Sequence, residues 1–293
     1  MKISTDNGTI RNLFGDVKST QMIAEAGFDG IDYTFYDIDK DNDILALPDA
    51  QRHALARDVL ACAKDNSIVI SQAHAPMAYR PEDTFGSKAY DDVIRSMEFA
   101  AMLECPQIVV HTIAFPREDR TIDRRARNLD FMRALLPYAE QFNINIGVEN
   151  LFTRDKKRKC FFGRNGTPEE LNSFIDELDN PRFVACCDLG HCALTGVEPE
   201  VFISEMDAKR LTMLHVHDTD YLSDSHTIPY LGKHDWEAIT DAIAKIGFAG
   251  MMNLEVLHFY EEFPKELIPA ALRMAAASAR LLADKVEAKM GNV

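Results

Sequence analysis

Short apolar runs alternate with longer amphipathic segments from one end of the chain to the other. Short runs bounded by turn residues are typical of buried strands, whereas apolar residues every three or four positions are typical of helices. The predicted strands are residues 2–4, 30–35, 68–74, 107–111, 144–149, 183–188, 211–217 and 251–256. The pattern therefore predicts eight consecutive strand–helix units.

The clearest helical pattern lies near the end of the chain. Its apolar face, with a spacing of three or four residues, consists of Leu267, Ala271, Ala275, Ala279, Leu282 and Val286. Residues 123–142 and 166–178 show similar patterns. The second of these segments contains Thr167, Pro168 and Glu170, which match an N-cap, a first helical position and a capping-box glutamate.

Eight strand–helix units without a linker predict an α/β protein with the (β/α)8 TIM-barrel fold, and residues 1–293 form one domain in this interpretation. A doubly wound sheet is the alternative. That fold favours a G-x-G-x-x-G motif after the first strand, and residues 4–15, "STDNGTIRNLFG", do not contain it. The barrel is therefore the expected fold.

Composition narrows the class of protein. Hydrophobic residues make up 46% of the chain, enough for a sizeable core. No apolar run reaches the ~18 residues of a membrane span, and the N-terminal segment lacks the apolar core of a signal peptide. We therefore expect a cytoplasmic protein without a membrane partner.

The formal net charge of −15 argues against a nucleic-acid partner, because it repels phosphate backbones. The six cysteines form no C-x-x-C pair, and Cys186 and Cys187 are adjacent in a predicted strand. We expect buried, reduced thiols.

Polar residues gather at the predicted strand ends, which face the active site in a barrel. Six consecutive strands supply His74, His111, Glu149, Asp188, His215 with His217, and Glu255, and His191 follows Asp188 closely. Any one of these residues could be an ordinary hydrogen-bonded rim residue, but six together indicate a shared site. Nitrogen and oxygen ligands without thiolate suit Mn²⁺, Zn²⁺, Co²⁺ or Mg²⁺. A cation would also offset repulsion between crowded carboxylates, so we predict a divalent-metal site.

Either of two histidines on the predicted strand 211–217 could be the metal ligand. His215 and His217 face the same way and are separated by two strand rises, about 6.6 Å. We predict that His217, nearer the rim, is the ligand. His215 would then support it from below or pack in the core.

Several motifs occur at barrel spacing: "AHAP" (73–76), "VVH" (109–111), "GVEN" (147–150), "CDLGH" (187–191), "HVHDTD" (215–220) and "DSHTIPYLGKHDW" (224–236). In this order they resemble the xylose isomerase-like barrels, which include sugar-phosphate isomerases, ketose 3-epimerases, inosose dehydratases and class II apurinic endonucleases. The epimerase pattern implies one metal, bound by Glu149, Asp188, His217 and Glu255. It also implies that Glu149 and Glu255 move a proton next to a carbonyl, and that His191 contacts the substrate.

The endonuclease pattern implies further metals. Its ligand sets would be His74, His111 and Glu149; Glu149, Asp188, His217 and Glu255; and His191, Asp224 and His226. In the alternative interpretation His74, His111 and His191 bind substrate. One departure is that the family pattern P-G-x-G is replaced here by Pro229, Tyr230, Leu231 and Gly232, so the conformation of this loop is an open question.

Residues 154–164, "RDKKRKCFFGR", concentrate positive charge in a predicted loop after strand 144–149. A solvated loop is the default interpretation. The alternative is recruitment of a phosphorylated or carboxylated substrate, with Phe161 and Phe162 covering the site. Asp32, near the end of strand 30–35, could also reach the mouth, but we assign it no role.

Together these observations predict a metal-dependent isomerase or epimerase of a small sugar or sugar phosphate, which works through an enediolate with Glu149 and Glu255 as acid and base. A dehydratase of an inosose-like or dehydroshikimate-like keto compound is the alternative. An endonuclease-like metal phosphodiesterase is disfavoured by the net charge. Crowded charged groups also argue against a barrel that binds without turnover. Association into a homo-oligomer stays open.

Overall fold

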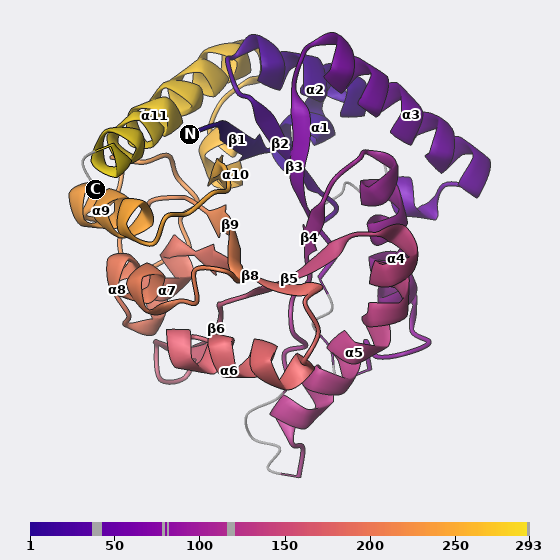
Figure 1. Cartoon of the computed structure of the whole chain (residues 1–293). Helices are drawn as coiled ribbons and strands as arrows, with labels where there is room; N and C mark the ends of the chain where they lie inside the picture. Colours follow the sequence, from indigo (N-terminus) through magenta and orange to yellow (C-terminus); the bar gives the residue numbers. More distant parts are fainter. Residues whose placement is uncertain (37–42, 78–79, 81, 116–120, 292–293) are drawn as a thin grey trace.

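Eight parallel strands of the described chain form the centre of the protein (Figure 1). The computed structural model describes residues 1–36, 43–77, 80, 82–115 and 121–291. The strands are β1 (Ile3–Asp6), β2 (Gly30–Thr34), β3 (Val69–His74), β4 (Gln107–Val109), β5 (Asn145–Glu149), β8 (Phe183–Asp188), β9 (Leu211–His215) and β10 (Met252–Leu254). Their order is β10-β1-β2-β3-β4-β5-β8-β9.

The two ends of this sheet meet just beyond β9. Val216 forms a parallel bridge with Leu254. Its N–H donates to the carbonyl of Asn253 at 2.8 Å, and its carbonyl accepts from the N–H of Glu255 at 3.1 Å. These contacts bring the sheet to a nearly closed barrel and confirm the predicted (β/α)8 fold. The assignment of residues 1–293 to one domain stays a prediction.

Helices surround the strands (Figure 1). They are α1 (Gly8–Phe14), α2 (Asp16–Glu25), α3 (Asp49–Asp65), α4 (Lys88–Met102), α5 (Arg124–Phe142), α6 (Pro168–Leu178), α7 (Leu189–Thr195), α8 (Pro199–Glu205), α9 (Trp236–Lys245), α10 (Leu257–Glu261) and α11 (Ile268–Met290), with the 3-10 helices η2 (Ile44–Ala46) and η3 (Lys265–Leu267). The predicted cap of α6 is present, because the hydroxyl of Thr167 accepts from the N–H of Glu170. The apolar face of α11 is buried from Ala271 to Val286, whereas Leu267 precedes the helix and is exposed.

The interior of the barrel is filled by a small apolar cluster separate from the main core. It consists of Val109, Val184, Cys186 and Met213, all buried. Gly147 leaves room for it, because a Cβ atom there would lie 2.1 Å from Cε of Met213. The polar residues at the strand ends therefore stand on a packed apolar floor, as in other barrels.

The segment predicted as a basic loop is a β-hairpin. β6 (Leu151–Asp155) pairs antiparallel with β7 (Cys160–Arg164), and the rings of Phe152 and Phe161 lie 5.3 Å apart. The prediction missed it because neither hairpin strand, LFTRD or CFFGR, alternates between apolar and polar residues. The run of charges from 156 to 159 forms the connection between its strands.

All six cysteines lie within the described residues and are free thiols. Four of them are buried, which agrees with the expectation, whereas Cys62 and Cys160 are only half-buried. No helix among the described residues is both long and apolar enough to span a membrane.

Candidate active site and metal centre

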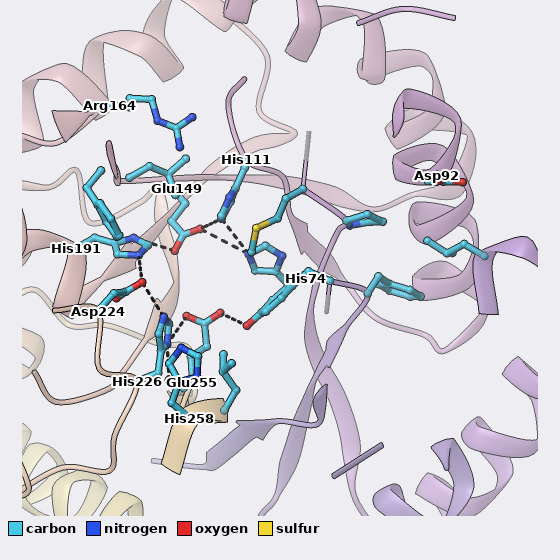
Figure 2. A pocket seen from close by; sticks show the side chains of 18 of the residues that line it. His74, Asp92, His111, Glu149, Arg164, His191, Asp224, His226, Glu255 and His258 are labelled. Carbon is cyan, nitrogen blue, oxygen red and sulfur yellow. Dashed lines mark hydrogen bonds and ion pairs between the residues drawn. The ribbon is translucent and has the colours of Figure 1, made fainter. Parts of the chain in front are cut away.

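The C-terminal ends of the strands surround a cavity of about 710 Å³ (Figure 2). β3 ends at His74, β5 at Glu149, β8 at Asp188 and β9 at His215, and Glu255 directly follows β10. His74, Glu149 and Glu255 line the cavity. Asp188 and His215 lie fully buried next to these residues. The strand ends thus bring the polar residues predicted from the sequence to one place.

Four side chains form the largest group of candidate ligands among the described residues. One ligand atom from each lies within 4.8 Å of the others in the group Glu149, Asp188, His215 and Glu255. Nδ1 of His215 is 2.9 Å from Oε1 of Glu149, 3.3 Å from Oε2 of Glu255 and 3.9 Å from Oδ2 of Asp188. None of the four is more than 4% exposed. Three buried carboxylates with one imidazole nitrogen fit a divalent cation, which would offset their mutual repulsion.

This group contains His215 where the sequence analysis expects His217. β9 ends at His215, two residues earlier than predicted, so His215 stands at the strand end and His217 in the following loop. Nε2 of His217 lies 3.1 Å from both carboxylate oxygens of Asp188, and its ring stacks on His226 with centroids 4.1 Å apart. His217 therefore also faces the site, and with His226 and Glu255 it forms another group whose ligand atoms lie within 4.8 Å of one another.

Asp32 supports His215 from the opposite side. Oδ2 of Asp32 lies 3.4 Å from Nε2 of His215 and accepts hydrogen bonds from the side-chain amides of Gln72 and Asn253 at 2.8 and 2.9 Å. A carboxylate behind a ligating imidazole fixes its orientation and tautomer. Asp32 thus turns Nδ1 of His215 toward the three carboxylates.

A second group of candidate ligands, His191, Asp224 and His226, lies beside the first. Oδ2 of Asp224 is 3.1 Å from Nε2 of His226 and 3.7 Å from Nε2 of His191, and Figure 2 shows Asp224 between the two rings. Burial acts to raise the pKa of Asp224, but His226 and His191 outweigh it and hold that pKa well below its usual range.

His74 and His111 lie on the other side of Glu149. Nε2 of His111 is 2.6 Å from Oε2 of Glu149 and 3.1 Å from Nε2 of His74. Burial, with smaller contributions from the charges of His74 and Arg164, lowers the pKa of His111 to about 4 despite the nearby Glu149 carboxylate. A neutral His111 can donate to or accept from one partner at each nitrogen.

Two of the carboxylates are ionised at neutral pH. Burial acts to raise the pKa of Asp188, but His191 and His217 outweigh it and lower that pKa to about 2. In the same way His215 and His111 hold the pKa of Glu149 well below its usual range against the effect of burial. Metal binding at these oxygens therefore requires no loss of a proton from either carboxyl group at neutral pH.

Buried Asp218 organises the loop between β9 and α9. Its carboxylate accepts hydrogen bonds of 2.9–3.1 Å from the backbone N–H groups of Thr219, Tyr230 and His234 and from the indole N–H of Trp236. This loop carries Asp224 and His226 to the site. The sequence analysis did not single out Asp218, although it ends the "HVHD" motif.

The structure answers the open question about Tyr230. Its φ of +77° is in the left-handed region, which glycine adopts without a steric penalty. Tyr230 therefore adopts a backbone conformation that the glycine of the family pattern could adopt without strain. Gly232 is required by close packing, because a Cβ atom there would lie 2.5 Å from the carbonyl oxygen of Thr219.

The sequence analysis also missed Tyr36 and the position of Arg164. The hydroxyl of Tyr36 donates to Oε1 of Glu255 at 2.7 Å, and both Tyr36 and Arg164 line the cavity. Residues 32, 34 and 36 alternate along one face, so strand periodicity could have grouped Tyr36 with Asp32. Phe161 and Phe162, which would cover the site in the alternative interpretation of the basic run, are not among the described residues that line this cavity.

The chain belongs to the xylose isomerase-like TIM barrel family, whose model matches residues 21–280. Among solved structures, a D-tagatose 3-epimerase-like protein is 17% identical with a TM-score of 0.74, and the match covers 100% of this chain and 99% of that one. A D-psicose 3-epimerase has 16% identity, a TM-score of 0.73 and coverage of 96% and 99%. The IolI protein with a bound zinc has 18% identity, a TM-score of 0.68 and coverage of 99% and 99%. At these identities the likeness establishes the fold.

Curated relatives match smaller parts of the chain. An uncharacterised protein of Sinorhizobium fredii is 27% identical over 168 residues, which are 54% of this chain and 50% of that protein. The 3-oxo-isoapionate decarboxylase of Pectobacterium atrosepticum is 25% identical over 130 residues, which are 44% of this chain and 39% of that protein. The chain thus spans half or less of the length of these two relatives.

The His215 geometry predicts unequal effects of two matched substitutions. His215→Ala removes the imidazole nitrogen at the centre of the three carboxylates, and should weaken Mn²⁺ binding more than the roughly 10- to 100-fold typical of residues that support a ligand. His217→Ala should weaken binding by no more than that amount. Isothermal titration calorimetry measures both affinities, and circular dichroism controls for folding. A larger loss in His217→Ala than in His215→Ala would contradict this assignment.

The Tyr230 conformation predicts a gain in stability. Tyr230→Gly should raise the free energy of unfolding by about 1 kcal/mol, because a left-handed backbone costs a residue with a Cβ atom that amount. Tyr230→Ala removes the same ring but keeps the Cβ atom, and should give no such gain. Urea unfolding of the two variants and the parent measures the difference. Equal stability of the two variants would argue against backbone strain at this position.

Proposed function

We propose that the protein is a metal-dependent isomerase or epimerase that moves a proton next to the carbonyl of a small sugar or sugar phosphate. One observation carries the proposal. The carboxylates of Glu149 and Glu255 line opposing sides of one cavity (Figure 2), and each also lies within 3.3 Å of Nδ1 of His215. Such a pair can act on both faces of a substrate carbon held between them.

Glu149, Asp188, His215 and Glu255 would hold the metal. When bound, a divalent cation supplies a Lewis acid that stabilises negative charge on the substrate's carbonyl oxygen. His215 replaces His217 in this ligand set because of its place at the end of β9. Mn²⁺, Zn²⁺, Co²⁺ and Mg²⁺ all suit carboxylate and imidazole ligands, and the IolI protein of the same fold binds zinc.

The acid and base are the two glutamates. In an epimerisation one takes the proton from the carbon next to the carbonyl and the other returns a proton to the opposite face. Tyr36 holds Oε1 of Glu255, and His111 lies 2.6 Å from Oε2 of Glu149, so that each carboxylate has a fixed orientation. His74, His111 and His191 line the cavity and would contact the substrate oxygens.

The relatives support this chemistry. Solved structures of the same fold include a D-tagatose 3-epimerase-like protein and a D-psicose 3-epimerase. A dehydratase is the alternative, because the same proton abstraction can be followed by loss of a hydroxyl group one carbon further on. That product is an enone, whose ultraviolet absorbance distinguishes it from an epimer.

A metal phosphodiesterase is favoured by one observation only, the second ligand group of His191, Asp224 and His226. This group fits a further metal ion, whereas the net charge of −15 opposes DNA binding. A cytoplasmic location, the absence of a nucleic-acid partner and self-association stay predictions.

Solvent deuterium tests the proposal. The manganese-loaded protein should incorporate deuterium next to the carbonyl of a ketose from a panel that includes D-fructose and D-fructose 6-phosphate, as measured by proton NMR. Glu255→Gln should slow incorporation about 100- to 10,000-fold, the usual contribution of a general acid or base. The matched control is Glu262→Gln, an exposed position on the same segment, which should leave the rate unchanged. Exchange that survives both Glu255→Gln and removal of metal by EDTA would refute the proposal.

A further inference from the structure

The described wall of the cavity carries one arginine among several carboxylates. Five carboxyl side chains line the cavity: Asp43, Asp92, Glu149, Asp224 and Glu255. Among the described residues that line it, Arg164 is the only lysine or arginine. An uncharged sugar can be bound by neutral donors and acceptors and by the metal, whereas a guanidinium group can also pair with an anionic group of a substrate.

The hairpin fixes Arg164 close to the reacting residues. In the β6–β7 register Arg164 pairs with Leu151, which is two residues after Glu149. Nη1 of Arg164 donates to the carbonyl of Thr112 at 2.5 Å, and the residue is half-buried. Figure 2 shows its guanidinium above Glu149 and beside His111, across the cavity from Glu255. The side chain thus stands at the base of the hairpin and within the cavity wall.

Two further arginines lie behind Arg164. An adjoining cavity of about 400 Å³ is lined by Arg164 together with Arg124 and Arg125. Arg125 lies 5.6 Å over the ring of Phe174 and is bound to Glu177 and Ser173, which hold its guanidinium in place. Glu177 pairs with Arg125, and Glu170 also lines this adjoining cavity, so Arg164 is the arginine that can meet an anion in the first cavity.

The basic tip of the hairpin is too distant to contact a substrate. The strand β6 spans Leu151–Asp155, four strand rises or about 14 Å. The exposed lysines at 156, 157 and 159 lie beyond that distance, which exceeds the Debye length of about 8 Å at physiological ionic strength. The tip can attract an anion weakly, whereas Arg164 can bind it.

We propose that the cavity takes an anionic sugar derivative, a sugar acid or a sugar phosphate, whose charged group is bound by Arg164. This inference rests on the proposed function only for the chemistry at the other end of the substrate. The planar guanidinium matches both carboxylate and phosphate with paired hydrogen bonds. The carboxylates that line the cavity would repel such a substrate in the absence of this contact, so Arg164 determines specificity.

Equilibrium binding of polyols that cannot react tests the inference. The probes are D-glucitol, which is neutral, D-gluconate, which carries a carboxylate, and D-glucitol 6-phosphate. Isothermal titration calorimetry on the manganese-loaded protein should show that at least one anionic probe binds about 10- to 100-fold more tightly than D-glucitol, the range expected for charge-assisted hydrogen bonds. If D-gluconate binds more tightly than D-glucitol 6-phosphate, the substrate is a sugar acid; the reverse order indicates a sugar phosphate.

Three variants test whether Arg164 causes the tighter binding of the anionic probes. Arg164→Met should abolish the preference for the anionic probe, and Arg164→Lys should retain part of it. Lys157→Met removes an equal charge from the hairpin tip and should leave the preference within twofold. Circular dichroism confirms folding of each variant, and Arg164→Lys keeps the test valid if Arg164→Met unfolds.

The inference is overturned if D-glucitol binds the parent as tightly as both anions. It is also overturned if Arg164→Met weakens neutral and anionic probes equally, which would indicate a structural role through Thr112, or if Lys157→Met has the same effect as Arg164→Met. These polyols lack a carbonyl group, so their binding is independent of proton exchange. Deuterium exchange with no charge preference refutes this inference alone, and a charge preference without exchange on any ketose refutes the proposed isomerase alone.

Discussion

Three buried carboxylates around one imidazole set the main constraint on this structure. Like unit charges about 4 Å apart repel by about 4 kcal/mol at an effective dielectric constant near 20. Glu149, Asp188 and Glu255 share one buried space around Nδ1 of His215. Such a group is stable only with opposite charge or donated hydrogen bonds. The neighbouring imidazoles supply part of this stabilisation, and a divalent cation would supply the rest.

The barrel provides the rigidity that this constraint requires. The parallel strands end at one edge of the barrel. The apolar cluster below that edge, which includes Cys186 and Met213, fills the interior and keeps the polar side chains at the rim. Asp32 and Tyr36, both from or just after β2, hold His215 and Glu255. Asp218 holds the loop that supplies the second ligand group. Asp32 and Tyr36 thus support ligands that other elements carry, whereas Asp218 lies in the same loop as Asp224 and His226.

The fold, and the place of several candidate site residues at strand ends, could be predicted from the sequence because both depend on short-range patterns. All eight strands lie where alternating apolar runs predict them, and His74, Glu149 and Asp188 are their last residues. The earlier end of β9, at His215 and not at His217, was missed because a strand's last residue depends on its partner, here the bridge from Val216 to β10. Arg164 was found only as part of a basic run, because its place in the cavity depends on cross-strand pairing with Leu151.

Anomalous scattering from a crystal soaked in Mn²⁺ tests the central claim most directly, since it locates the cation without reference to any substrate. The account predicts a peak bound by Glu149, Asp188, His215 and Glu255, the four side chains whose ligand atoms lie within 4.8 Å of one another. A crystal in which this group holds no peak, or in which the bound metal is ligated by His217 in place of His215, would contradict it.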